Sequence, residues 1–223
     1  MLKYFIQNHQ REVTIHIPGH LKNIGIKMSG GTSSSLIAYL LCQYKKLYRP
    51  EIKIFPITLM INVKPYQIEY TKDIINWLED DTGIKLEALS TGIGNDFNSV
   101  QRQENLVRAT YEKHNLDCHF VGLVKNPPDD CFDFEDKNEN PGRKSLDNDS
   151  EHDEYQEVPS FKSFRPFANI NKKGVAELYE TLHLTNSLFP ITRSCESWTK
   201  DIQDHCGRCW WCSQRHWGFG RIE

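Results

Sequence analysis

Patterns typical of buried strands alternate with helical patterns through much of the chain. Apolar runs at 24–28, 52–60, 85–89 and 118–124 predict strands, and apolar side chains at helical spacing predict helices over 36–44, 66–78, 99–114 and 172–184. This alternation predicts an α/β fold, with a parallel sheet and helices on both of its faces. Ligands of such sheets bind at the carboxyl ends of strands, in loops that lead into helices. The loop after residue 28 is therefore the first candidate site.

That loop, named here the serine–glycine loop, spans residues 29–35. Glycines let the backbone approach an anion closely, and free N–H groups at a helix N-terminus then hold it. Serine hydroxyls add hydrogen bonds and cap helices well. The loop lacks the Gly-Lys-Ser/Thr of a Walker A motif. We expect it to bind phosphate, with a plain connecting loop as the alternative; its residues are Ser29, Gly30, Gly31, Thr32, Ser33, Ser34 and Ser35.

Four of the seven cysteines gather near the C-terminus, at Cys195, Cys206, Cys209 and Cys212. A Cys-x2-Cys turn lets two thiolates reach one ion, and the remaining two cysteines complete a tetrahedral shell. We expect this cluster to hold one Zn²⁺ ion. A closed four-cysteine shell leaves no position for water, so the ion would be structural. An iron–sulfur cluster and four metal-free cysteines are the alternatives.

The segment 126–157 differs in composition from its surroundings, because it carries a net charge of −9 in a chain whose total is −3. We interpret it as a solvated surface loop, with a substrate lid or a partner-binding segment as the sharper alternative. The expected organisation is one α/β domain over 1–185, which includes this acidic loop, and a C-terminal metal-binding segment over 186–223.

Composition limits the location and the partners of the protein. No apolar run approaches the roughly 20 residues that a membrane span needs, and the N-terminal stretch lacks the apolar region of a signal peptide. We therefore expect a cytoplasmic protein with no membrane partner. The basic balance outside the acidic loop is too diffuse to predict RNA binding, although nucleic acid is not excluded. A homodimer is a possible assembly.

Two of these motifs resemble those of known enzymes. The serine–glycine loop, SGGTSSS, resembles the SGGxDS pyrophosphatase loop of the adenine nucleotide α-hydrolase (PP-loop) superfamily. The string C-x10-C-G-x-C-x-x-C-x-x-R-x-x-x-F, which includes Gly207, Arg215 and Phe219, resembles the C-terminal part of 7-cyano-7-deazaguanine synthases, enzymes of queuosine biosynthesis. Asp130 and Cys131 resemble part of that family's YPDCR substrate motif. Lys173 resembles the lysine that precedes its zinc unit.

This resemblance implies a Rossmann-like nucleotide-binding domain, ATP as cosubstrate and a ligase that forms carbon–nitrogen bonds. In the family, a deazapurine carboxylate attacks the α-phosphate of ATP, pyrophosphate leaves, and ammonia attacks the acyl-adenylate to give an amide. A second activation then dehydrates the amide to a nitrile. Lys173 and Arg215 would contact phosphate or carboxylate, and Asp130 and Cys131 would contact the deazapurine. Mg²⁺ is a further candidate cofactor.

The chain also departs from the family pattern at two positions. Ser33 replaces the loop aspartate, and Phe132 stands where the substrate motif has arginine. Two other functions therefore remain open: a PP-loop enzyme that thiolates tRNA or conjugates a deazapurine to another acceptor, and a nucleotide-binding relative without catalysis. Thiolation usually needs a nucleophilic cysteine, but Cys42 lies in an apolar helical pattern that favours packing in the core.

Overall fold

The fold is seen in a computed structural model, which describes residues 1–61, 66–94, 99–128, 146, 150–158, 161–195 and 205–223. Six strands form the central sheet, in the order β5-β4-β3-β6-β8-β7. All neighbouring strands in it run parallel except β7, which pairs antiparallel with β8. The strands are β3 (Asn23–Lys27), β4 (Lys53–Ile61), β5 (Ser90–Gly94), β6 (Cys118–Val121), β7 (Tyr155–Val158) and β8 (Phe161–Phe164).

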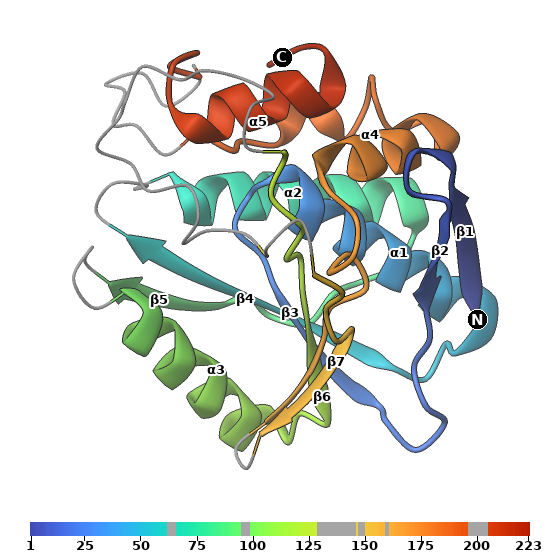
Figure 1. The fold of residues 1–223 in the computed structure, drawn as a ribbon. Helices are drawn as coiled ribbons and strands as arrows, with labels where there is room; N and C mark the ends of the chain where they lie inside the picture. The colour runs from blue at the N-terminus through green and yellow to red at the C-terminus, as the bar shows by residue number, and fades with distance from the viewer. Residues whose placement is uncertain (62–65, 95–98, 129–145, 147–149, 159–160, 196–204) are drawn as a thin grey trace.

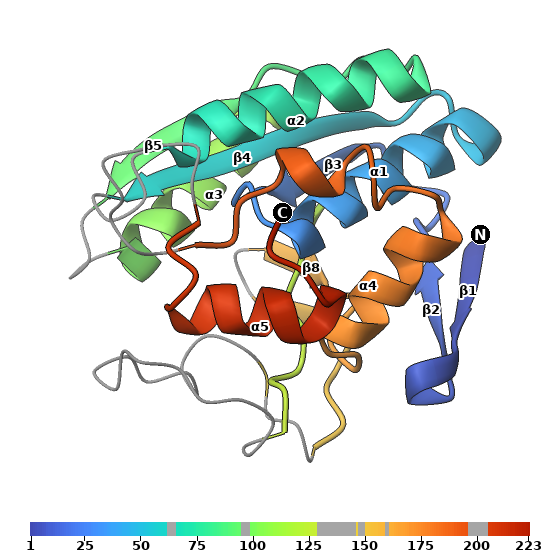
Figure 2. The same cartoon turned by 90° about the horizontal axis from the view of Figure 1, so that it is seen from above.

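Helices cover both faces of this sheet, as the alternating pattern predicted. Figures 1 and 2 show α1, α2, α4 and α5 together on one face and α3 on the other. Right-handed crossovers explain why α3 lies on the opposite face from α1 and α2. The chain moves from β3 through β4 to β5 at one edge of the sheet, and α3 then connects β5 back to β6 in the opposite direction. The helices are α1 (Thr32–Tyr48), α2 (Gln67–Thr82), α3 (Ser99–His114), α4 (Lys172–Thr181) and α5 (Trp210–Phe219).

Outside the sheet, an N-terminal antiparallel hairpin of β1 (Leu2–Ile6) and β2 (Arg11–Ile15) packs beside α1 and α4. Two short 3-10 turns, η1 (Gln7–His9) and η3 (Phe189–Ile191), complete the described elements. The largest apolar core joins this hairpin, the sheet and the helices above it. Among its fully buried side chains are Ile24, Ile26, Leu36 and Leu41.

One predicted strand is wrong in its position. Residues 85–89 form no strand, and β5 begins directly after them at Ser90. The backbone N–H of Glu87 does donate to the carbonyl of Ile54 at 2.9 Å, so the predicted segment runs beside β4. The continuous ladder pairs Ser90–Gly94 with Ile57–Ile61 instead. Apolar content therefore identified the segment that approaches the sheet but not the residues that pair.

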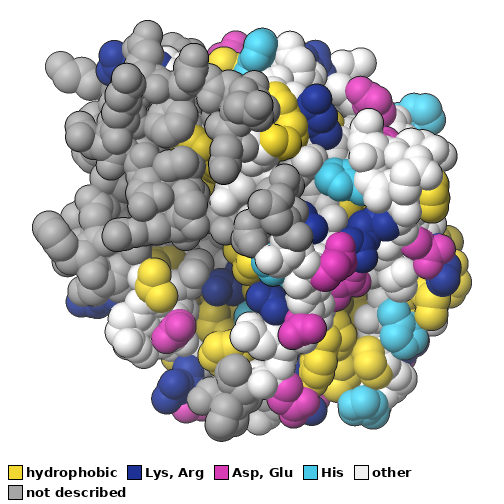
Figure 3. Space-filling view, in the orientation of Figure 1, with side chains coloured by type: hydrophobic (Ala, Val, Ile, Leu, Met, Phe, Trp, Pro, Cys, Tyr) yellow, Lys and Arg dark blue, Asp and Glu magenta, His cyan; other side chains and the backbone are white. Residues whose placement is uncertain are grey.

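The end of α2 agrees with the sequence, whereas the expected serine cap of α1 is wrong, because its N-cap is Gly31 and no side chain caps it. Gly83 ends α2 with a φ of 72°, a conformation that glycine adopts without strain. Asn171 caps α4, since its side chain accepts a hydrogen bond from the backbone N–H of Lys173 at 3.0 Å. No described helix is long and apolar enough to cross a membrane. On the described part of the face in Figure 3, acidic and basic side chains are interspersed rather than separated.

Candidate functional site

The serine–glycine loop lies where the order of the strands reverses. β3 and β6 are neighbours, but the chain continues from β3 to β4 on one side and from β6 to β8 on the other. At such a point the connections leave in opposite directions and open a crevice at the carboxyl ends of the strands. The loop follows β3, and Gly122 follows β6, so both border this crevice.

Hydrogen bonds within the loop fix its shape. The hydroxyls of Ser34 and Ser35 donate to the carbonyl oxygen of Gly31, at 3.1 and 2.9 Å, and the backbone N–H of Ser29 donates to Ser34 Oγ at 3.3 Å. Gly30 has a φ of 77°, which favours glycine. Gly31 precedes the first helical residue, Thr32, so the N-terminus of α1 opens into the crevice. This is the geometry expected of an anion-binding loop.

Gly122 allows the end of β6 to approach this helix closely. A Cβ atom at position 122 would lie 2.8 Å from the backbone nitrogen of Ser34 and 3.0 Å from the carbonyl carbon of Ser33. Any side chain here would push the two backbones apart. The close approach therefore depends on glycine at position 122.

Lys172 places a buried amine against the loop. Its Nζ donates to Thr32 Oγ1 at 3.1 Å and to Ser33 Oγ at 2.9 Å, and the residue is 6% exposed. Burial, with a smaller contribution from repulsion by Arg215, lowers the pKa of Lys172 to about 7. An amine in this state gains a proton when an anion arrives beside it.

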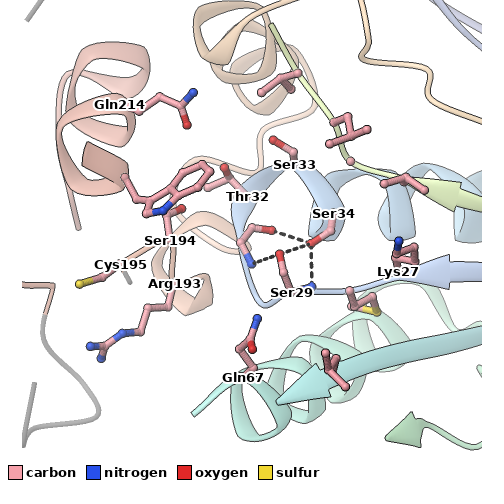
Figure 4. Close-up of a pocket in the computed structure, with 18 of the residues that line it drawn as sticks. Lys27, Ser29, Thr32, Ser33, Ser34, Gln67, Arg193, Ser194, Cys195 and Gln214 are labelled. Carbon is pink, nitrogen blue, oxygen red and sulfur yellow. Dashed lines mark hydrogen bonds between the residues drawn. The ribbon is translucent and has the colours of Figure 1, made fainter. Parts of the chain in front are cut away.

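The crevice deepens into a cavity of about 470 Å³, a size typical of small-molecule sites. Figure 4 shows the serine–glycine loop, Lys27, Gln67, Arg193 and Gln214 around it. Its described lining holds three cationic side chains, Lys27, Lys172 and Arg193, and neither Asp nor Glu. This charge balance favours an anionic ligand. A protein-held Mg²⁺ prefers carboxylate ligands, so the donor set of the described lining does not fit one.

The four C-terminal cysteines converge on one point. Their sulfur atoms all lie within 4.8 Å of one another. The Cys206–Cys212 and Cys195–Cys209 sulfur pairs are each 3.9 Å apart. Four thiolates around one ion at ~2.3 Å would be separated by about 3.8 Å. The described residues therefore fit one tetrahedral metal ion, which would hold the segment before α5 to the start of that helix.

Contacts of the segment around Cys195 join the cysteine cluster to the serine–glycine loop and to Tyr66. The backbone N–H of Arg193 donates to the carbonyl of Gly30 at 2.7 Å, two residues before Cys195. The hydroxyl of Tyr66 donates to the carbonyl of Cys195, and the Arg193 guanidinium lies 4.0 Å from the centre of the Tyr66 ring. Cys195 and Trp211 also line the cavity. The metal-binding segment therefore forms one wall of the pocket.

Two sequence-predicted residues lie elsewhere. Lys173 is exposed and sits 4.7 Å over the ring of Trp217, outside the cavity lining. Arg215 is fully buried, and its guanidinium donates to Thr192 Oγ1 at 2.8 Å and to the carbonyls of Phe189 and Ile222. In this structure Arg215 therefore ties α5 to the preceding turn. Asp130 and Cys131 lie outside the described residues.

All seven residues of the serine–glycine loop lie together, as do the four cysteines of the metal cluster. Sequence reasoning missed several polar residues of the cavity, among them Lys27, Lys172, Arg193, Gln67 and Gln214. Lys172 and Lys173 are the first two residues of α4, and the structure shows that Lys172 is buried and Lys173 exposed. No pattern in the sequence marked the two glutamines.

Comparisons with known proteins leave the family of the chain undetermined. No protein-family model matches it, and no curated protein matches it. Among solved structures, the U34-tRNA thiolase NcsA from Methanococcus maripaludis, determined with its [4Fe-4S] cluster, is similar with a TM-score of 0.48 and 15% identity. The match covers 80% of this chain and 62% of that one, so the chain spans about three-fifths of the matched structure's length. A likeness of this size does not establish a shared activity.

Proposed function

We propose that the protein is an ATP-dependent adenylating enzyme of the PP-loop type, which activates a deazapurine carboxylate for amide or nitrile formation with ammonia. The observation that carries the proposal is the contact of the Lys172 amine with Thr32 and Ser33 at the N-terminus of α1. A helix N-terminus and a buried cation at one point can neutralise a polyphosphate. The carboxylate acceptor and ammonia come from the family resemblance of the loop and the C-terminal string.

In this proposal, Lys172 has the phosphate-binding role that the sequence suggested for Lys173. Backbone N–H groups at the start of α1 and the Lys172 ammonium would hold the phosphates and stabilise the charge that develops as pyrophosphate leaves. Arg193, which also lines the cavity beside Tyr66, would attract the carboxylate. The cysteine cluster would hold Zn²⁺ in a structural role, because four thiolates leave no open coordination position.

The direct test is incubation of the full chain with ATP, ammonia and 7-carboxy-7-deazaguanine, followed by mass spectrometry and measurement of pyrophosphate release. We expect the amide or nitrile, and we expect Lys172→Met to slow pyrophosphate release at least 100-fold. Lys173→Met is the matched control, because this exposed neighbour lies outside the cavity, and it should stay within twofold of the wild type. Equal effects of the two variants would contradict the assignment of Lys172.

A nucleotide-binding relative without catalysis is the second candidate, favoured by Ser33 and by a described lining without carboxylates. ATP binding without release of pyrophosphate would support it. Thiolation of tRNA would need another nucleophile than Cys42 or Cys118, because burial raises the pKa of both to about 12, which leaves them poor nucleophiles. The third free cysteine, Cys131, lies outside the described residues. Pyrophosphate release that depends on added tRNA would nevertheless point to that activity.

A further inference from the structure

Two buried glutamine side chains line the cavity with polar atoms that no described residue satisfies. Gln67 is 6% exposed and Gln214 is 1% exposed. Gln67 Oε1 and Gln214 Nε2 have no hydrogen-bond partner among the described residues. Figure 4 shows them on opposite sides of the cavity, Gln67 at the start of α2 and Gln214 on α5. One unsatisfied acceptor and one unsatisfied donor therefore border the same space.

Such atoms are costly in a folded protein. A buried amide that loses its water and gains no partner destabilises the fold, whereas an apolar side chain of similar size would not. Apolar side chains occupy other positions of the same lining, since Met28, Leu59 and Val124 are buried there. A partner that enters the cavity and hydrogen-bonds to both amides would offset this cost. The two glutamines are thus better explained by a ligand than by stability of the empty fold.

The chemistry of the lining identifies the class of ligand. On one side of the cavity, cationic side chains and the N-terminus of α1 suit an anionic group. Neutral amides suit an uncharged edge that carries both donors and acceptors, as in the pairing of glutamine with a nucleobase. Tyr66 and Trp211 add aromatic surface to the same cavity, against which a flat ring can pack.

We propose that Gln67 and Gln214 form a subsite for the hydrogen-bonding groups of a nucleobase-like ring whose anionic group lies at the serine–glycine loop. The inference rests on the proposed function for the identity of that anionic group. Two ligands carry the required ring, ATP through its adenine and the deazapurine acid through its own heterocycle. The subsite is independent of the residues of the loop, so it can be tested separately from them.

The test is calorimetric titration of the metal-loaded full chain with three probes: ATP, 7-carboxy-7-deazaguanine and inorganic tripolyphosphate, which has no ring. The variants are Gln67→Met and Gln214→Met, which keep the length of the side chain and remove the amide. Gln101→Met is the matched control, because Gln101 is exposed and lies outside the cavity. If one cavity variant fails to fold, the variant at the other position decides.

We expect each cavity variant to weaken the binding of one ring-bearing probe by about tenfold and to leave tripolyphosphate unchanged. Weaker binding of ATP would assign the subsite to adenine, and weaker binding of the acid would assign it to the acceptor. The thermal midpoint of the ligand-free variants should equal or exceed that of the wild type, whereas a purely structural role would lower it.

Binding of both ring-bearing probes within twofold of the wild type in both variants would overturn the inference, as would failure of both probes to bind the wild-type chain. Failure of tripolyphosphate alone would count against the phosphate role of the serine–glycine loop in the proposed function. In that case the ring-bearing probes still decide the role of the glutamines.

Discussion

Lys172 and Lys173 are adjacent in the sequence and have opposite surroundings. Lys172 is buried against Thr32 and Ser33, whereas Lys173 is exposed over Trp217. Successive residues of a helix point about 100° apart, so the register of α4 decides which lysine reaches the loop. Ser33 offers only a hydroxyl, and the Lys172 amine lies beside it without a described carboxylate in the lining.

The depressed pKa of Lys172 predicts how stability depends on pH. Between about 7 and 10.5 the unfolded chain keeps the proton on this amine and the folded chain has lost it. Stability should therefore rise with pH from about 7 to 10.5. Below about pH 7 this group should add no pH dependence, because both states carry the proton there. The gain is on the order of a few kcal/mol over the full interval.

Urea unfolding at pH 7 and pH 9 measures this dependence in the wild type and in Lys172→Met. The difference between the two proteins excludes the contributions of the other titrating groups, cysteines included, because these groups are common to both. The rise between the two pH values should be larger in the wild type. An identical rise in both proteins would show that Lys172 titrates normally.

At the scale of elements, the site depends on the close approach of β6 to α1. Parallel strands β3 and β6 bring their carboxyl ends to one edge, and Gly122 lets the chain after β6 pass against the backbone of Ser33 and Ser34. Hydroxyl contacts inside the loop then hold the N-terminus of α1 open toward the cavity. The loop's shape is thus set by its neighbours as well as by its own serines.

Replacing Gly122 by alanine should displace the start of α1, since the new Cβ would meet backbone atoms that cannot rotate away. We expect a loss of about 1–3 kcal/mol in the free energy of unfolding and weaker binding of tripolyphosphate. Urea unfolding and calorimetry measure the two effects. Gly19→Ala is the control, because nothing lies within 4 Å of a Cβ at that position. Wild-type tripolyphosphate binding in Gly122→Ala would show that the close approach is dispensable.

At the scale of the whole molecule, the C-terminal segment forms one wall of a pocket whose other lining residues lie between residues 27 and 172. The cysteine cluster positions α5, which carries Trp211 and Gln214, and Arg193 bonds the same segment to Gly30. Figure 2 shows α5 lying beside α4 over the sheet. Metal binding and nucleotide binding should therefore be coupled, because both require this segment in place.

Metal analysis of the purified chain should find one zinc per chain, and its removal by a chelator should lower both the thermal midpoint and the affinity for ATP. Cys206→Ser should do the same, because it removes one ligand of four. Cys42→Ala is the control, since Cys42 is buried in the core away from the cluster and its loss should leave the metal content unchanged. Iron with sulfide in place of zinc would contradict the structural-zinc prediction.

Local patterns sufficed for much of this molecule. Strand and helix periodicity predicted the α/β architecture, and the serine–glycine loop and the cysteine spacing each lie within a short stretch whose geometry is largely local. The predictions failed where the pairing of strands with one another decided which residues form a strand. The ladder of β5 begins five residues after the predicted start of that strand, and no pattern predicted the hairpin β1–β2 or the pair β7–β8.

Which residues line the pocket together was decided by the tertiary structure alone. Lys172 meets Thr32 across 140 positions of sequence, and Gln67 and Gln214 reach one cavity from α2 and α5. Periodicity reports which side of an element is buried, but it does not report what faces that side. A buried lysine or glutamine becomes informative only once its partner, or the lack of one, is seen. The sequence by itself determined the layers and the two motifs, and packing determined the chemistry between them.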